Sequence, residues 1–164
     1  MNFDWNSPDY SAVLKARTSV LMELRKNPNA IPKLKEYYAH HWVDFINDWA
    51  MTYDPRKQTE KYSPFLLFPR QEEFIVWVYN LWQDGRRGLG EKSRDVGFTW
   101  LCAAAAVCVW LFHSNSVIGF GSRKKELVDN GEADPDSIFW KIRTLIDLLP
   151  VEFLPANHTA GRKW

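Results

Sequence analysis

The chain has 164 residues, with 21 Lys and Arg against 20 Asp and Glu, nine tryptophans and an aromatic share of 15%. An aromatic content this high excludes an intrinsically disordered chain, and the length is enough for one domain with a sizeable core. A net charge of +1 excludes a global basic field that would attract nucleic acid, so any DNA contact needs a local basic patch.

The first 60 residues predict a helical region. Ser7-Pro8-Asp9 has the hydroxyl, the early proline and the acid of a helix start, and apolar residues recur at helical spacing from Tyr10 to Leu24. Asn27-Pro28-Asn29 ends this helix. A single second helix is expected after it, with an apolar stripe formed by Leu34, Tyr38, Trp42, Phe45 and Trp49.

Residues 51–63 are polar and contain Asp54-Pro55-Arg56-Lys57, which is typical of a linker. We therefore predict two parts, a helical region over residues 1–60 and a second part over residues 61–164. The second part opens on Phe68-Pro69-Arg70-Gln71 and a helix that ends at Gly85. The expected buried face of this helix is formed by Phe74, Trp77, Val78, Leu81 and Trp82.

The stretch from Glu91 to Trp100 has the parts of a phosphate-binding loop, with the lysine displaced. Such a loop needs backbone N–H groups, a cation and a magnesium-binding hydroxyl. Gly97 and Thr99 occupy the usual glycine and hydroxyl positions, and a long lysine stem could bring Lys92 to the phosphates from five residues upstream. The candidate nucleotide-binding residues of the loop are Lys92, Ser93, Arg94, Asp95, Val96, Gly97, Phe98 and Thr99.

Two alternatives stay open at this point. The loop could be a surface loop that precedes a core helix, with Gly97 and Thr99 there by chance. Gln71 could be an ordinary residue in the first turn of an amphipathic helix, although its amide carries the donor and the acceptor that suit the N6/N7 edge of adenine.

Residues 98–112 are apolar except for Thr99, which predicts a helix buried on nearly all sides. Its N-terminus would point free N–H groups and the positive end of the helix dipole at an anion. Ser116-Val117-Ile118-Gly119-Phe120-Gly121 then predicts a short buried strand. Loop, helix and strand together would form the first βαβ step of an α/β fold.

The buried helix also bears on redox state and location. Cys102 and Cys108 both lie in it, with no zinc-ligand pattern nearby, so we expect buried reduced thiols. The apolar run is too short for a membrane span, and no signal peptide opens the sequence. These features predict a soluble protein of the cytoplasm.

Two further helices are predicted downstream. A short polar helix is expected to begin at Ser122, and Asp134-Pro135-Asp136 precedes an amphipathic helix that Pro150 ends. Arg86 and Arg87 ahead of the apolar helix could contact DNA phosphates or could simply be solvated. After this helix, Arg123, Lys124 and Lys125 form a second exposed basic group, which is typical of ordinary protein surface.

The run from Lys92 to Thr99 resembles the variant Walker A loop of the large terminase subunits of tailed bacteriophages, in the form that places the lysine at the front. Phe68-Pro69-Arg70-Gln71 resembles the adenine-recognising Q motif of the same family. The resemblance covers roughly Asn29 to Pro155, and Asp95 departs from the glutamine that is common at its position.

The resemblance implies a fold, two cofactors and a set of roles. The fold would be α/β, a helical N-terminal segment followed by the first part of a P-loop (RecA-like) domain with an incomplete sheet. The cofactors would be ATP and Mg²⁺. Lys92 would offset phosphate charge, Arg94 would be an arginine finger in cis, Thr99 would hold magnesium and Gln71 would recognise adenine.

For the whole protein, the resemblance implies a motor that drives double-stranded DNA into a procapsid and then cuts it, in the host cell cytoplasm and away from membranes. Its partners would be the small terminase subunit, the portal and procapsid, and other copies of itself in a ring. Apolar strand residues followed by Asp-Glu, which hydrolysis needs, are missing from this sequence. We therefore expect a fragment that hydrolyses little or no ATP.

Two other functions fit the sequence less well. One is another helicase-like P-loop motor with the same loop. The other is a helical interaction protein, in which Gly97 and Thr99 have no ligand and the aromatic stripes dock a partner.

Overall fold

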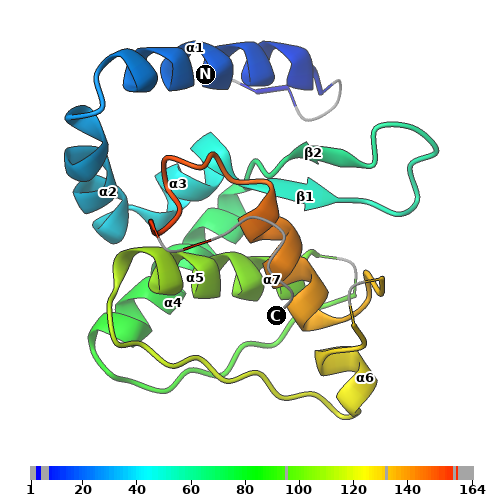
Figure 1. Ribbon diagram of the computed structural model, residues 1–164. Helices are drawn as coiled ribbons and strands as arrows, with labels where there is room; N and C mark the ends of the chain where they lie inside the picture. The colour runs from blue at the N-terminus through cyan, green and yellow to red at the C-terminus, as the bar shows by residue number, and fades with distance from the viewer. Residues whose placement is uncertain (1–2, 5–7, 95, 132, 157, 159–164) are drawn as a thin grey trace.

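The computed structural model describes residues 3–4, 8–94, 96–131, 133–156 and 158. Within them, helices predominate and one antiparallel pair of strands forms a small sheet (Figure 1). The chain therefore contains both α and β structure. In chain order the elements are α1 Tyr10–Lys26, α2 Ala30–His40, α3 Trp42–Trp49, β1 Met51–Tyr53, β2 Tyr62–Pro64, α4 Pro69–Gln83, α5 Phe98–Phe112, α6 Lys125–Val128 and α7 Ile138–Asp147.

Local signals place the ends of several helices where the sequence predicts them. The Asp9 carboxylate accepts a hydrogen bond from the Ser11 amide and caps α1, while Ser7 lies outside the described residues. Asn27 ends α1, and Gly85 follows α4 with a φ of +62°. α5 has the predicted bounds, and its first residue follows Gly97.

The prediction of one continuous second helix is wrong, because the chain bends at His41 into α2 and α3. The Nδ1 atom of His41 lies 2.7 Å from the carbonyl oxygen of Tyr37, the group that the His41 amide would bond in an unbroken helix. The amide donates to the Tyr38 carbonyl instead, at 3.2 Å. The side chain thus takes the place of a helical hydrogen bond and redirects the chain.

The predicted linker at residues 51–63 is also wrong, since its ends form the β1–β2 hairpin. Thr52 pairs with Ser63 in the middle of the ladder, and Asp54 at the start of the turn bonds the backbone amide of Arg56. The hydrophobic core is continuous across this region and includes residues from Leu24 to Phe153. The hairpin is therefore attached to the same core as the segments on either side of it.

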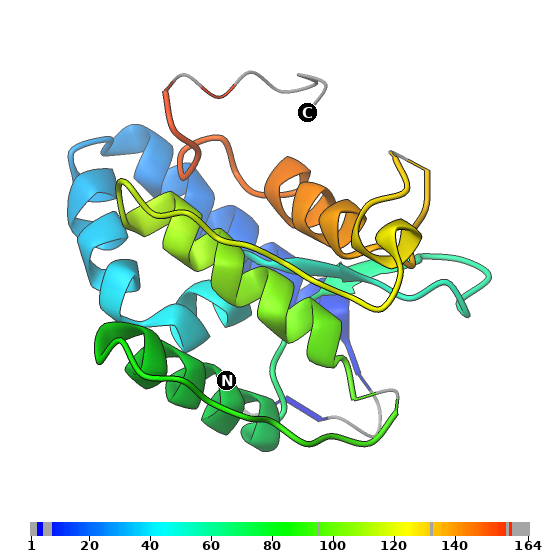
Figure 2. The same cartoon turned by 90° about the horizontal axis from the view of Figure 1, so that it is seen from below.

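Helix α5 lies at the centre of the core, in contact with α2, α3, α4 and α7 (Figure 2). Its four consecutive alanines are buried and allow neighbouring helices to approach closely. Cys108 is fully buried, which raises the pKa of its thiol, and Cys102 is half-buried. Both cysteines are free, as predicted, and no described helix is long and apolar enough to cross a membrane.

The buried face of α4 and the first residues of α6 and α7 differ in part from the prediction. Ile75, which lies outside the predicted stripe, is the fully buried residue of α4, while Trp77 and Trp82 are exposed. In α7 the N-cap is Ser137, whose hydroxyl accepts from the Trp140 amide, not a residue of the preceding Asp-Pro-Asp run. The polar helix expected from Ser122 begins instead at Lys125.

The predicted buried strand over Ser116–Gly121 is wrong. The segment has no strand partner in the described part of the chain, and Val117 is 98% exposed. A buried parallel strand needs hydrogen-bonding neighbours on its edges, and here β1 and β2 pair with each other. Between β2 and Gly97 the described residues form helix α4 and no strand, so no βαβ step is formed around α5.

Candidate functional site

A cavity of about 750 Å³ opens at the N-terminal end of α5. This volume lies within the range of small-molecule sites in proteins, roughly 300–1,000 Å³. The β1–β2 hairpin forms one wall, and the segment that leads into α4 forms another. The lining residues are 10, 52–57, 63–66, 68, 70, 71, 96, 97 and 100.

Gly97 joins the loop to α5 at the edge of this cavity. Its φ of +73° belongs to the left-handed region, which glycine adopts without a steric penalty. The amides of Phe98, Thr99 and Trp100 lie in the first helical turn, where N–H groups have no acceptor within their own helix. Together with the helix dipole, they make this end of α5 attractive to an anion.

Gln71 connects α4 to the loop ahead of Gly97. Its Oε1 accepts a hydrogen bond from the Phe68 amide at 3.0 Å, and its Nε2 donates to the Val96 carbonyl at 3.1 Å. The side chain therefore lies beside the predicted phosphate loop, and its amide holds the two segments together. One Nε2 hydrogen and one Oε1 lone pair remain for a ligand.

The cations predicted for the site lie elsewhere. Lys92, Ser93 and Arg94 are exposed in the loop that follows α4, and they do not line the cavity. Asp95 lies outside the described residues. Phe98, at the usual lysine position, packs its ring on Phe74 of α4 with 4.9 Å between ring centroids. This contact fixes the start of α5 against α4.

Thr99 is half-buried in the first turn of α5 and does not line the cavity. Among the described residues, no group of three or more His, Cys, Asp or Glu could hold a metal ion. A magnesium ion at this end of α5 would therefore need ligands from the phosphates of a bound nucleotide in addition to the Thr99 hydroxyl.

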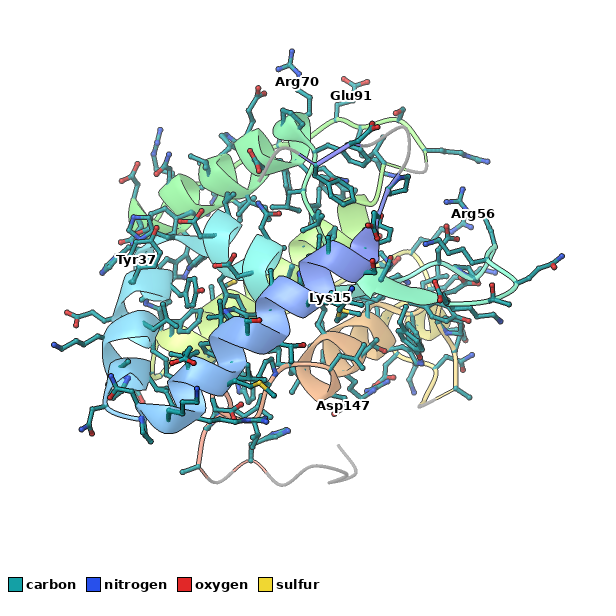
Figure 3. All side chains as sticks on the ribbon, turned by 90° about the horizontal axis from the view of Figure 1, so that it is seen from above. Lys15, Tyr37, Arg56, Arg70, Glu91 and Asp147 are labelled. Carbon is teal, nitrogen blue, oxygen red and sulfur yellow. The ribbon has the colours of Figure 1, made fainter. Side chains whose placement is uncertain are left out.

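The cations that line the cavity are Arg56, Lys57 and Arg70, and Asp54 is the carboxylate among the lining residues. Arg56 comes from the hairpin turn and Arg70 from the first turn of α4 (Figure 3). Sequence reasoning missed this cluster. The basic pair in Asp54-Pro55-Arg56-Lys57 was the available signal, but nothing in the sequence shows that the turn folds back toward α5.

The contacts that these three cations make within the protein are weak. Arg56 bonds both oxygens of Asp54, at 2.9 and 3.1 Å, and this contact lowers the pKa of the Asp54 carboxyl. Lys57 lies 5.3 Å from the centre of the Tyr10 ring, and Arg70 pairs with Glu73 at 2.7 Å. Exposed ion pairs of this kind contribute little free energy. A phosphate that enters the cavity can therefore replace the present partners of these cations.

No protein-family model, curated protein or solved structure matches the chain. The resemblance to terminases thus rests on the residues of the two motifs. Function is argued below from those motifs and from the geometry of the cavity.

Gly97 is open to a direct test. We expect Gly97→Ala to lower the free energy of unfolding by about 1–2 kcal/mol, because an L-residue is strained at positive φ. The new Cβ would also lie 3.3 Å from the Nε2 of Gln71 and disturb its bond to the loop. Urea unfolding followed by circular dichroism measures this change.

Gly119→Ala is the matched control, because a Cβ there meets nothing within 4 Å. We expect it to change the free energy of unfolding by less than about 0.5 kcal/mol. Equal effects of the two substitutions would contradict the role given to the Gly97 conformation.

Proposed function

We propose that this chain is the ATP-binding portion of a DNA-packaging ATPase of the large-terminase type, with the nucleotide held at the N-terminal end of α5. The observation that carries the proposal is the cavity there, where a helix N-terminus capped by Gly97 meets three cationic side chains. Gln71, the residue that resembles the Q-motif glutamine, is bonded to the same loop.

A nucleotide triphosphate would use residues that line the cavity together with residues of the adjoining loop and helix turn that do not line it. The first-turn amides of α5 would bind phosphate oxygens, and Lys92 and Arg94 would approach from the exposed loop. Thr99 would be the protein ligand of Mg²⁺. The aromatic lining, which includes Phe68 and Trp100, offers flat apolar surface to a base. Bound magnesium would neutralise phosphate charge.

The partners follow from the resemblance. Double-stranded DNA would contact exposed basic residues such as Arg86, Arg87 and Arg123, and the small terminase subunit, the portal and a ring of copies would complete the motor. The carboxylates that activate water are missing from the sequence, so we expect this chain to bind ATP and to hydrolyse little of it.

One observation favours a different class of function. The described residues form no βαβ step, and Ser116–Gly121 pairs with no strand, which suits a helical interaction protein. The two functions differ in one measurable property. A nucleotide-binding protein takes up ATP saturably through the residues at the start of α5, and an interaction protein does not.

The test is equilibrium binding of a fluorescent ATP analogue with magnesium. We expect saturable binding by the unmodified chain and a loss of about tenfold or more in Lys92→Ala, since a charge-assisted contact to phosphate is removed. Lys124→Ala, on an exposed residue outside the cavity, is the control and should bind as the unmodified chain does.

A third variant, Arg56→Ala, separates two sources of the cation. If Arg56→Ala weakens ATP binding and Lys92→Ala does not, the cation that binds the phosphates is Arg56 of the hairpin. The displaced-lysine interpretation is then wrong. Absence of saturable binding by the unmodified chain contradicts the proposed function and leaves the interaction protein.

A further inference from the structure

A second cavity, of about 400 Å³, lies between the C-terminal half of α5, α7 and residues 116–120. It shares no lining residue with the cavity at the start of α5. Its walls are apolar, with Trp110 on α5 and Ile142 and Ile146 on α7. Ala106 has a small side chain at the floor of this cavity and leaves the space that a larger residue would fill.

Residues 116–121, called the strap below, cross α5 in the view of Figure 2, and three of them line this cavity. Ser116, Ile118 and Phe120 alternate along the strap and line the cavity, while Val117 is 98% exposed. The Phe120 ring meets Phe139 of α7 at 6.2 Å between centroids. Within the described chain no backbone hydrogen bond holds the strap, so it can separate from the helices by breaking side-chain contacts alone.

Two charged residues line the cavity, Arg143 and Asp129, and the Arg143 side chain is only 13% exposed. Its two terminal nitrogens bond the Asp129 carboxylate, at 2.7 and 3.3 Å, and one of them also bonds the Gly131 carbonyl at 3.0 Å. The Nε atom is buried and has no partner in the described residues. An unpaired buried donor is costly, and an acceptor on a ligand could remove that cost only after a shift of the Arg143 side chain, because this atom is closed to solvent.

We propose that this cavity binds a small apolar carboxylate, with its hydrocarbon body between α5 and α7 and its carboxylate on Arg143. The volume falls in the range of ligand sites, and mostly apolar walls with a few placed polar groups are their usual composition. A guanidinium stays charged and matches a carboxylate geometrically, which favours an acid over a neutral molecule. Asp129, whose side chain is 46% exposed, competes for the same guanidinium.

Octanoate and octan-1-ol are suitable probes, because they share a hydrocarbon chain and differ in charge. Binding to the full chain can be followed by calorimetry and by total tryptophan fluorescence, to which Trp110 in the wall contributes. We expect Arg143→Met to weaken octanoate binding about tenfold and Asp129→Asn to strengthen it several-fold. The binding of octan-1-ol should be the same in both variants as in the unmodified chain.

The apolar part of the site is tested separately. Ala106→Leu places a larger side chain in the cavity. It should weaken the binding of both probes about tenfold or more, because loss of the cavity removes most of the buried contact. Val117→Leu also enlarges an apolar side chain, by one methylene group and on the outer side of the strap, and should leave the binding of both probes unchanged. If Ala106→Leu does not fold, Phe120→Ala, with Val117→Ala as its control, tests the same wall.

The proposal is overturned if octanoate does not bind, or if Arg143→Met and Asp129→Asn leave its affinity unchanged. It is also overturned if octanoate binds Ala106→Leu and Phe120→Ala as tightly as the unmodified chain. This site is independent of the nucleotide proposal, since none of these variants touches the cavity at the start of α5.

Discussion

Phe153→Ala is expected to lower the free energy of unfolding by about 3–5 kcal/mol, the usual cost of truncating a fully buried phenylalanine. Phe153 lies in the turn after α7 and is 1% exposed. Its ring centroid lies 4.9 Å from that of Trp49, 5.7 Å from Phe45 and 5.9 Å from Tyr38. The substitution leaves a cavity among three aromatic rings that backbone movement cannot fill.

Val151→Ala is the control for this prediction. Val151 belongs to the same turn but is 69% exposed, so its truncation should cost less than about 0.5 kcal/mol. Urea unfolding, followed by tryptophan fluorescence and by circular dichroism, gives both values. If Phe153→Ala costs no more than Val151→Ala, the segment after α7 does not close the core.

The second large effect is expected at Arg17, where Arg17→Met should destabilise the protein by about 2–4 kcal/mol. The guanidinium donates to the carbonyl of Asn47 at 2.7 Å and to that of Ala50 at 3.1 Å. Burial lowers the pKa of Arg17 to about 10, so the group stays charged at neutral pH. Methionine keeps the apolar stem and loses both hydrogen bonds.

The Arg17 effect should be largest on the attachment of α1. Val13 and Leu24 are the buried residues of that helix, so a large share of its hold on α3 is polar. Amide hydrogen exchange in α1 should be faster in Arg17→Met than in the unmodified protein. Exchange in α5 should change less. Lys15→Met, at an exposed position of the same helix, should leave exchange and stability unchanged, and identical behaviour of the two variants would contradict this role.

Where local chemistry decides a boundary, the sequence is a reliable guide. The bounds of α5 were predictable because Gly97 can adopt a positive φ and because fifteen helical residues follow without a breaker. The region where α1 starts and the end of α4 were predictable for the same kind of reason, the Ser7-Pro8-Asp9 run and a glycine at position 85, although the cap of α1 is Asp9 and not the expected hydroxyl. Each of these signals acts within a few residues.

The bend at His41 and the hairpin at residues 51–64 were not predictable in this way. The apolar stripe continues from Tyr38 to Trp49 at helical spacing. This spacing does not show that the His41 ring forms a hydrogen bond with a backbone carbonyl of the preceding turn. The hairpin has polar composition, and it forms because its flanking residues are anchored in the core. Phe65, which follows β2, bonds the carbonyl of Ala50, which precedes β1.

For the candidate site, the sequence identified Gln71 and the loop up to Gly97, and the structure joins them through the Val96 carbonyl. It did not identify Arg56 and Lys57 as lining residues, because their place depends on how the hairpin packs against α1 and α7. Roles for Lys92, Arg94 and Thr99 stay predictions, to be decided by the binding experiment.

By itself, the sequence determined the long apolar helix and the glycine at its N-terminus, although the fold it predicted around this helix was an α/β domain with a longer sheet. Only the tertiary structure decided that residues 116–121 form a strap and not a strand, and that Arg143 lies buried beside them. The reason is physical. Helices bond within themselves, whereas strands, cavities and buried charges depend on partners that are distant in sequence.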